Sequence, residues 1–453
     1  MAKIKRIFIA NRGEIAVRII RTCRELGIET VLGVSEANRD TLGAQLATRV
    51  VCLGPAAATQ SYLKVGTVIE AAMGTGCDAI HPGYGFLSEN KDLAEACAET
   101  DLIFIGPSPD NLTAVGDKLT ARTHDEKAGV PLTPGGSVDT EAEALKLAEA
   151  VGFPLLIKAV SGGGGRGMKR VNSAAELPAQ LNLAISEAAA AFGDGRVYLE
   201  RFVTVGRHVE VQILSDGETV LHTGERDCSV QRRYQKVVEE APAPGLPDTL
   251  RQGLLDAAVT YARHISYRSL GTVEFLVDVE RQEFYFLEMN ARIQVEHPVT
   301  EAITGLDLIA LQIAIAEGKP LGMRQNDITL HGHAIECRLN AEDIQSDFMP
   351  SPGRIKQAWF PSLTGVRVDT HMQPGAMISP FYDSMIAKLI TWGPTRADAI
   401  ARMQAVLNLH TLDGVTTNAP LHSAIMADET FQQGGVDTTY LTGVLPRLTE
   451  DKT

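Results

Sequence analysis

The sequence predicts a mixed α/β and α+β protein in which a parallel sheet domain comes first and antiparallel strands follow. An apolar stretch at residues 4–10 is followed within residues 14–34 by a helical segment and a second apolar stretch. This strand–helix–strand order is typical of a parallel sheet. Farther along, residues 271–279 and 283–290 are rich in β-forming residues and are separated by three residues, which predicts an antiparallel hairpin.

The first unit continues through a ligand-facing loop. Gly27 ends the first helical segment, and no G-x-G-x-x-G follows the first strand, so a dinucleotide-binding fingerprint is absent. Residues 77–90, CDAIHPGYGFLSEN, predict a strand followed by a Gly/Pro turn. Loops at the carboxyl ends of parallel strands commonly face ligands. Residues 103–106 complete the unit, because Pro107 and a second proline interrupt the chain there.

We expect three domains, at residues 1–115, 116–330 and 331–453. The Pro/Gly-rich stretch at 129–137 separates off a smaller unit, at about residues 131–203, inside the second domain. The last domain combines strands, a turn-rich middle and a helix that starts at about Arg396. Chains of 453 residues commonly form about three domains of ~150 residues each.

Composition excludes several function classes. The formal net charge is −14, whereas nucleic-acid binding or binding to anionic membranes needs a basic surface. The six cysteines include no CxxC and no Cys/His cluster, which is typical of reduced thiols in a cytoplasmic protein. We find neither a signal-peptide core nor a run of 18 apolar residues.

A glycine-rich loop is the first candidate site. Residues 161–167, SGGGGRG, join two predicted strands, the first of which contains Lys158. Successive glycines allow backbone N–H groups to approach an anion closely. A lid over phosphates and a flexible hairpin tip both fit the pattern, and the flanking Lys158 and Arg166 favour the lid. Lys118 is either a second phosphate-binding cation or a solvated lysine on a helix.

An opposed pair of carboxylates is the second candidate. If the predicted hairpin turns at Arg281, Glu274 and Glu288 lie directly opposite each other on one face. Such a pair needs a compensating charge, and Mg²⁺, which prefers carboxylate and phosphate oxygens, would provide it. If the chain stays extended beyond this pair, the same face is wholly polar, whereas a half-exposed strand is the alternative. Its members would be Glu288, Asn290, Arg292, Gln294 and Glu296.

A basic segment is the third candidate. Residues 231–244 contain Arg232, Arg233 and Lys236 in an otherwise acidic protein. An anion-binding site and a solvated basic face fit this concentration of charge equally well.

Taken together, these motifs resemble those of the biotin carboxylase family over about residues 1–445. The conjunction is far more specific than the glycine loop alone. The motifs are NRGEIAVR (11–18), HPGYGFLSEN (81–90), the loop at 158–168, ERDCSVQRRYQKVVEEAPAP (225–244), EMNARIQVEHPVTE (288–301), ECRLNAED (336–343), MPSPG (349–353) and YDSMIAKL (382–389).

The resemblance implies an N-terminal parallel α/β domain, an ATP-grasp fold with a mobile lid, and a C-terminal mixed domain. It implies that ATP, Mg²⁺ (or Mn²⁺) and bicarbonate carboxylate carrier-bound biotin, with carboxyphosphate as the intermediate. The implied partners are a biotin carboxyl carrier protein, a carboxyltransferase subunit and a second copy of the chain. We find no A-M-K-M-like biotinylation motif and no carboxyltransferase segment, so we expect both to be other polypeptides. The final acceptor stays open among acetyl-CoA, another acyl-CoA, pyruvate and other small molecules.

The resemblance also implies residue roles by motif position. The expected nucleotide residues are Lys118, Lys158, Gly164 and Gly165 for the phosphates, and Glu200, Arg201, Val203, His208, Gln231 and Tyr234 for the rest of ATP. The expected metal ligands are Glu274, Glu288 and Asn290. The expected bicarbonate residues are Lys236, Arg292, Gln294 and Val295, with Glu296 as the base. Arg338 is expected to stabilise the biotin enolate, and Tyr84 to lie near the biotin ring.

Two positions depart from the family pattern. Tyr234 stands where the family has His, and Arg201 stands where it has Lys. Both are on the nucleotide side, so they bear on ATP affinity, whereas the bicarbonate and biotin positions all match. Two other readings remain: a different ATP-grasp ligase, such as a carbamoyl-phosphate or purine-pathway carboxylating enzyme, and a catalytically weak nucleotide-binding regulator. Bicarbonate-dependent ATP hydrolysis stimulated by free biotin distinguishes the three.

Overall fold

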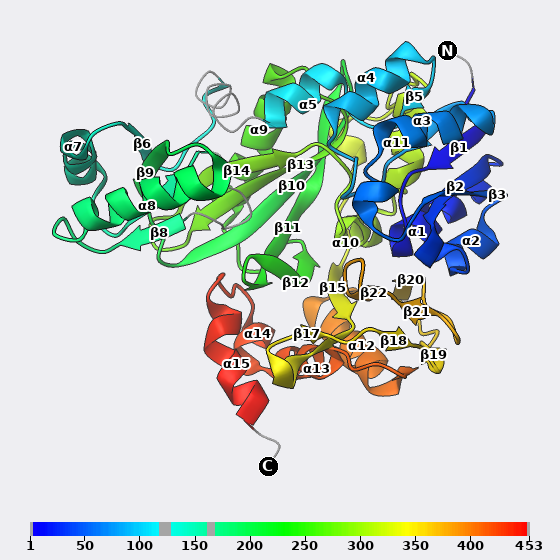
Figure 1. Cartoon of the computed structure of the whole chain (residues 1–453). Helices are drawn as coiled ribbons and strands as arrows, with labels where there is room; N and C mark the ends of the chain where they lie inside the picture. Colours follow the sequence, from blue (N-terminus) through cyan, green and yellow to red (C-terminus); the bar gives the residue numbers. More distant parts are fainter. Residues whose placement is uncertain (1–2, 117–127, 161–167, 451–453) are drawn as a thin grey trace.

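The computed structural model describes residues 3–116, 128–160 and 168–450, with the chain ends at opposite sides of the molecule (Figure 1). The N-terminal unit contains a five-stranded sheet in the order β3-β2-β1-β4-β5, and all its pairings are parallel, as predicted. Its strands are β1 (Arg6–Ile9), β2 (Glu29–Ser35), β3 (Arg49–Gly54), β4 (Ala79–His81) and β5 (Ile103–Phe104).

Helices connect these parallel strands. They are α1 (Gly13–Glu25), α2 (Leu42–Leu46), α3 (Val65–Gly74), α4 (Lys91–Glu99) and α5 (Pro109–Gly116). After α1 the chain reverses at Gly27, whose φ of +70° favours glycine. Apolar residues of α1, including Ile15 and Ile19, are buried in one core with β1 and β2. Because Glu14 and Arg18 of the same helix are buried too, they must find polar partners inside the protein.

A small antiparallel sheet forms the unit that we expect to act as a lid. Its order is β6-β9-β7-β8. The strands are β6 (Gly135–Val138), β7 (Leu155–Ala159), β8 (Met168–Val171) and β9 (Val197–Arg201), with helices α7 (Glu141–Val151) and α8 (Leu177–Phe192). The prediction that strands flank the glycine loop is confirmed by β7 and β8, while residues 161–167 themselves lie outside the described residues.

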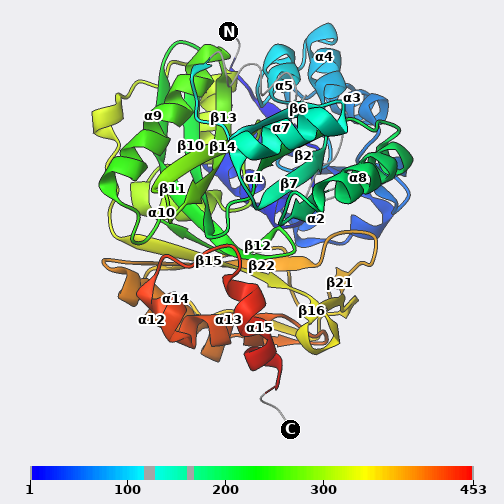
Figure 2. The ribbon, with the colours of Figure 1, turned by 90° about the vertical axis from the view of Figure 1, so that its left-hand side faces the viewer.

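One long sheet organises the rest of the chain. Its order is β14-β13-β10-β11-β12-β15-β22-β20, with antiparallel pairing throughout. Its strands are β10 (Gly206–Asp216), β11 (Val220–Arg232), β12 (Gln235–Ala241), β13 (Arg268–Asp278), β14 (Glu283–Asn290), β15 (His333–Asn340), β20 (Val366–Thr370) and β22 (Met385–Gly393). Figure 2 shows β12, β15 and β22 between the upper part of the molecule and the C-terminal helices.

Helix α9 (Asp248–His264) covers one face of this sheet. Its Leu254, Ala258 and Tyr261 are buried in one core with Val211 and Val273 of β10 and β13. Because side chains alternate between the faces of a strand, the polar residues of these strands point to the other face. Helices α10 (His297–Thr304) and α11 (Leu308–Ala316) follow β14 in the chain.

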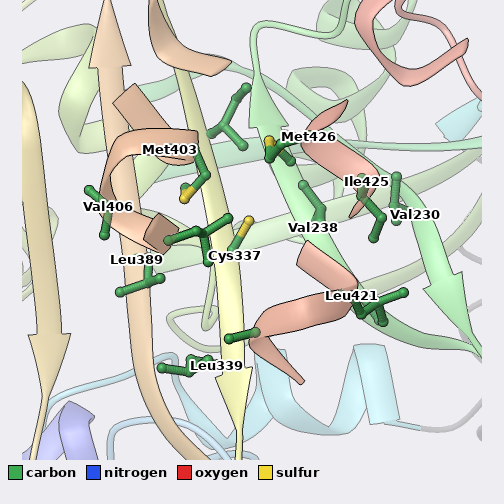
Figure 3. Close-up of a cluster of buried hydrophobic side chains, with 14 of the residues drawn as sticks. Val230, Val238, Cys337, Leu339, Leu389, Met403, Val406, Leu421, Ile425 and Met426 are labelled. Atoms are coloured by element: carbon green, nitrogen blue, oxygen red, sulfur yellow. The ribbon is translucent and has the colours of Figure 1, made fainter. Parts of the chain in front are cut away.

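The C-terminal helices pack against the distal part of the same sheet. Figure 3 shows Cys337 and Leu389 of β15 and β22 among side chains that include Met403 and Ile425. The alternate residues, such as Arg338 and Lys388, therefore belong to the opposite face. The helices are α12 (Arg396–Leu409), which confirms the predicted helix start, α13 (Ala419–Ala427), α14 (Glu429–Gln433) and α15 (Tyr440–Glu450).

Short strands complete the C-terminal region. They are β16 (Glu342–Asp343), β17 (Met349–Pro350), β18 (Gly353–Arg354), β19 (Gln357–Trp359), β21 (Met377–Ile378) and β23 (Thr411–Asp413). Within the described ranges, no single helix is long and apolar enough to cross a membrane. Helices α10 and α11 have sufficient length and apolarity only when taken together, and they are bent by 99° relative to each other.

Candidate active site

A row of charged residues crosses four neighbouring strands of the long sheet. Glu288 of β14 faces Glu274 of β13, which faces Glu210 of β10, which faces Arg226 of β11. The predicted Glu274/Glu288 pairing is confirmed, although the hairpin turn is not centred on Arg281. The pairing Asp278–Glu283 alone would place Leu287 opposite Glu274, and a β-bulge there moves Glu288 into place.

Lys236 of β12 joins the acids of this row to the following turn. Its ammonium lies 2.5 Å from Glu210, 2.9 Å from Glu274, 2.6 Å from Glu296 and 3.2 Å from the Gln294 amide oxygen. Burial alone would lower the pKa of Lys236, but these three carboxylates raise it well above its usual value. Burial would likewise raise the pKa of Glu274, but Lys236 and His208 hold it well below the ordinary range. The protein's own cations therefore balance the buried acid that we expected a metal to compensate.

Two overlapping sets of side chains around Glu274 are candidates for holding a divalent cation. In the first, His208 Nε2 is 3.1 Å from Glu274 Oε2, and the ligand atoms of His208, Glu210 and Glu274 all lie within 4.8 Å of one another. In the second, the predicted one, the exposed Glu288 faces the buried Glu274, and Asn290 donates to Glu274 over 2.9 Å. Carboxylate and amide oxygens suit Mg²⁺, so the predicted set agrees with its chemistry, and Glu274 belongs to both sets.

The residues after Asn290 do not remain a strand, so that part of the extended-chain prediction is wrong. Strand β14 ends at Asn290, and a turn leads into α10, where Pro298 occupies the first turn of the helix. The predicted polar residues still gather: Gln294 and Glu296 reach Lys236, and Arg292 donates to Asn290 Oδ1 over 2.7 Å. Arg292 also lies 3.1 Å from Glu89, in the loop that precedes α4.

Arg338 of β15 lies between two buried acids. Its guanidinium donates to Glu239 over 2.6 Å and lies 3.0 Å from Glu296. Burial would raise the pKa of Glu296, but Lys236, Arg338 and Arg226 hold it well below the ordinary range, so the carboxylate is ionised. Burial, followed by the nearby Glu14, raises the pKa of Tyr84, whose hydroxyl donates to that carboxylate. The Arg338 charge also acts on Tyr84, so both expected biotin residues belong to one region.

Three of the expected ATP residues, Glu200, Arg201 and Val203, lie on or just after β9 in the predicted lid. Lys158 forms an ion pair with Glu200 across β7 and β9, and Val203 is buried beyond the strand. Arg201 donates to the Tyr285 hydroxyl over 3.2 Å, which links β9 to β14. Arg201 also lines a cavity of about 470 Å³ beside Pro134 and Phe284. Lys118, Gly164 and Gly165 lie outside the described residues.

The basic segment at residues 231–244 was predicted to be either an anion-binding site or a solvated basic face, and its residues differ in this respect. Arg232 and Arg233 lie 2.5 and 3.0 Å from the exposed Asp347, whereas Lys236 is in the acid cluster. Tyr234 is 67% exposed, in the turn between β11 and β12. The side-chain amide nitrogen of Gln231 donates to His208 Nδ1 over 2.9 Å, so Gln231 contacts the site through that histidine.

The sequence did not single out several buried charges of this site, among them Glu210, Arg226 and Glu239. Residues 206–216 alternate polar and apolar side chains, which is the pattern of a half-exposed strand. In the fold the polar face is covered, and Arg226 donates to Thr300 of α10 over 3.0 Å. The signal that could have identified these residues is an acidic side chain inside neighbouring strands, such as Glu210 in β10 and Glu239 in β12.

Glu239 and Glu336 form a further opposed pair of buried carboxylates, on β12 and β15. Burial raises the pKa of Glu239 to about 7, against the effect of Arg338, and raises that of Glu336 well above its usual value. These two carboxyls therefore bind more protons in the folded protein than in the unfolded chain between about pH 4.5 and 7. Their contribution to the free energy of unfolding falls as pH rises through this window, whereas buried histidines with lowered pKa values, such as His81 and His371, act in the opposite direction.

Replacing Glu336 by Gln should make the free energy of unfolding fall less, or rise more, with increasing pH than in wild type, because it removes one of the two raised carboxyls of this pair. The measurement is the urea midpoint at a series of pH values from about 5 to 8. Glu99→Gln, on the exposed surface of α4, makes the same charge change and should keep the wild-type slope. If the urea midpoint changes with pH equally in wild type and in Glu336→Gln, the proton affinity of Glu336 is not raised by the fold, and the prediction is contradicted.

Known family models cover almost the whole chain. The model described as biotin carboxylase, N-terminal domain, matches residues 3–112. The carbamoyl-phosphate synthase L chain, ATP binding domain, matches residues 117–324, and the biotin carboxylase C-terminal domain matches residues 336–443.

Curated proteins and solved structures agree with these matches. Biotin carboxylase 1 of Bacillus subtilis is 50% identical over 97% of this chain and 98% of its own length. Biotin carboxylase of Pseudomonas aeruginosa is 49% identical over 97% of this chain and 98% of its own length. The biotin carboxylase domain dimer of Hydrogenobacter thermophilus 2-oxoglutarate carboxylase, in complex with MgADP, ADP and bicarbonate, has a TM-score of 0.92 at 41% identity and covers 100% of both chains. Campylobacter jejuni biotin carboxylase, in a complex named beta-gamma-ATP, has a TM-score of 0.92 at 43% identity and covers 97% of this chain and 99% of its own.

Proposed function

Because the chain belongs to the biotin carboxylase family, it is a ligase that carboxylates biotin with ATP and bicarbonate, and we propose that the reaction occurs at the Lys236 cluster. The observation that supports this location most directly is the set of contacts around Glu296. Its two carboxylate oxygens face Lys236 at 2.6 Å and Arg338 at 3.0 Å. One acid is thereby flanked by a cation suited to bicarbonate and a cation suited to biotin.

The enzyme uses ATP and Mg²⁺, and we propose that Glu274, Glu288 and Asn290 hold the metal against the nucleotide phosphates. Mg²⁺ supplies charge neutralisation and orientation for phosphoryl transfer. Glu274 is well suited to a ligand role because its pKa is held well below the ordinary range, so it is ionised. Metal binding then adds to the two protein cations already around that carboxylate, Lys236 and His208.

Bicarbonate would bind beside Lys236, Arg292, Gln294 and the Val295 backbone. In the structure Lys236 and Arg338 both neutralise Glu296, which makes it a weak base. An anion placed between these cations would compete for them and so raise the proton affinity of Glu296. We propose that Glu296 then accepts the bicarbonate proton, so that a bicarbonate oxygen attacks the γ-phosphate of ATP, the bond to the bridging oxygen breaks, and carboxyphosphate and ADP form.

Biotin would react on the Arg338 side. The guanidinium is permanently charged and can stabilise the enolate oxygen of the ureido ring once its contact with Glu296 loosens. Tyr84, whose hydroxyl donates to Glu14, would lie near the biotin ring.

We propose that nucleotide contacts come from Lys118, Lys158, Gly164, Gly165, Glu200, Arg201, Val203, His208, Gln231 and Tyr234. Lys158, Glu200 and Arg201 share the lid strands β7 and β9, which supports a lid that delivers them to the cluster. We also propose domain divisions at residues 1–115, 116–330 and 331–453, which follow the segments of the three family models closely.

Membership of the family implies a biotin carrier as partner, and we propose a separate carboxyltransferase subunit as a second partner. We further propose a cytoplasmic location, which the six free cysteines support.

We predict a homodimer. The similar Hydrogenobacter thermophilus structure is named a dimer. Helix α1 carries three arginines, of which Arg18 is buried against Glu301 and Asp307 beside a cavity of about 430 Å³, while Arg21 and Arg24 are exposed. Sedimentation at micromolar concentration should give a species of twice the chain mass of 48.7 kDa. Only a monomer at that concentration would contradict the prediction.

The function is tested by ADP release with each substrate omitted in turn. We expect ATP cleavage that requires bicarbonate and Mg²⁺ and that free biotin stimulates. Cleavage that requires another acceptor would indicate a different ATP-grasp ligase. Nucleotide binding without any bicarbonate-dependent turnover would indicate a regulator.

A further inference from the structure

Lys388 is a fully buried cation that none of the roles above uses. It lies on β22, and its side chain has 0% exposure. It faces Arg338 on β15 across one strand pairing and Asp369 on β20 across the other. Residues directly opposite in adjacent strands share a face, so Lys388 lies beside the arginine assigned to biotin.

The contacts of Lys388 join three separate parts of the chain. Its ammonium donates to the Val295 carbonyl over 2.8 Å and lies 3.1 Å from Glu14 Oε1. Val295 immediately precedes Glu296, and Glu14, on α1, also accepts a hydrogen bond from Tyr84. One ammonium group thus connects β22, the turn that presents the proposed base, and the helix beside the proposed biotin loop.

The turn at residues 291–296 depends on such contacts. It lies between β14 and α10, so no strand ladder fixes its backbone. At its start Ala291 donates its N–H to Glu89 over 3.0 Å, and near its end Val295 accepts from Lys388. Loss of the second contact would free the segment that positions Gln294 and Glu296.

Lys388 is charged in this environment. Burial alone would lower its pKa, but Glu14, Glu336 and Asp369 raise it above the usual value. A buried ammonium needs hydrogen-bond acceptors for its N–H groups. The ammonium of Lys388 contacts the Glu14 carboxylate and the Val295 carbonyl, which lies outside helix and strand.

We propose that Lys388 is a positioning residue for the bicarbonate reaction, which fixes the Val295 carbonyl and thereby the Glu296 carboxylate. This inference rests on the proposed assignment of the bicarbonate pocket. Lys388 would not touch substrate; it would act through the turn, and Glu14 would hold its charge in place. A displacement of about 1 Å in a reacting group can reduce a rate by ~10²-fold.

The test uses two variants of the full-length chain. Lys388→Met alone leaves Glu14 buried without its cation, so it is combined with Glu14→Gln, which makes the pair neutral. Lys388→Arg keeps the cation for Glu14 but directs its donors differently. We expect both to melt close to wild type, to lose ~10–10²-fold in kcat/KM for bicarbonate in ATP cleavage, and to keep the KM for MgATP.

A matched pair elsewhere separates positioning from stability. Arg251 and the buried Glu225 lie 2.8 Å apart, on α9 and β11. Glu225→Gln with Arg251→Met should change melting temperature only, with wild-type kinetics for bicarbonate. An unchanged kcat/KM for bicarbonate in either folded Lys388 variant would overturn the inference.

Two further results remain distinct from that outcome. If the double variant fails to fold, Lys388→Arg alone decides the question, because its buried charge is retained. If the wild-type protein shows no bicarbonate-dependent ATP cleavage, the proposed bicarbonate pocket is wrong. If the wild type is active and the Lys388 variants have the same kinetics, only the inference about Lys388 is wrong.

Discussion

Arg338→Gln is expected to reduce biotin carboxylation by ~10²–10³-fold while substantial bicarbonate-dependent ATP cleavage remains. Removing the guanidinium removes the group proposed to stabilise the enolate, which acts only after ATP is cleaved. Glu296→Ala should impair both steps, because deprotonation of bicarbonate precedes carboxyphosphate. The measurement is the ratio of ADP formed to biotin carboxylated, determined for both variants at saturating MgATP.

Stability must be separated from chemistry in this comparison. Arg338→Gln leaves the buried Glu239 and Glu296 without one of their cations, and breaking such a pair costs about 3–5 kcal/mol. Arg396→Gln is the matched control, because Arg396 is similarly buried and lies 2.6 Å from the buried Glu240. The control should lose stability and keep the wild-type ratio. If Arg338→Gln lowers both rates equally, Arg338 belongs to the bicarbonate or phosphate site.

Glu288→Gln is expected to abolish ATP cleavage, with kcat at least ~10²–10³-fold lower, since it removes a proposed metal ligand. The fold should not suffer. Glu288 is exposed, and its neighbour Glu274 is already paired with Lys236 and His208. Without Mg²⁺ the melting temperature should therefore be unchanged or slightly higher, because one carboxylate opposite another has been neutralised.

Glu280→Gln provides the control for this change. It lies in the exposed turn of the same hairpin and makes the same change in net charge. Its kcat should equal that of wild type at every Mg²⁺ concentration. A large loss of melting temperature in Glu288→Gln would instead show that the carboxylate pair has a structural purpose.

Local patterns predicted the elements and part of the site. The parallel strands and the hairpin follow from apolar runs and turn residues, and the Glu274/Glu288 pairing followed although the bulge at Leu287 was not foreseen. The turn is centred between Glu280 and Arg281, half a residue before the predicted centre at Arg281, and the bulge restores the predicted pairing. The gathering of Gln294 and Glu296 was also foreseen, but through an extended chain that ends at Asn290 in the structure.

Long-range relations were beyond local pattern. Lys236 and Glu296 are sixty positions apart in the chain, and the pairing of β12 with β15 joins residues 238–241 to 334–337. Neither relation leaves a local periodicity. Burial of Glu239, Glu336 and Lys388 likewise depends on how the C-terminal strands extend the sheet, whereas alternation in a strand distinguishes only its two faces.

The continuity of the long sheet has a consequence for dissection of the chain. A cut near residue 330 would follow the sequence division but would strip β15 from β12. The exposed edge of β12 would present unpaired N–H and C=O groups, a template for intermolecular pairing and aggregation. Glu239 would at the same time lose the guanidinium that lies beside it. We therefore expect the second and third segments to unfold together, and an isolated nucleotide-binding fragment to self-associate.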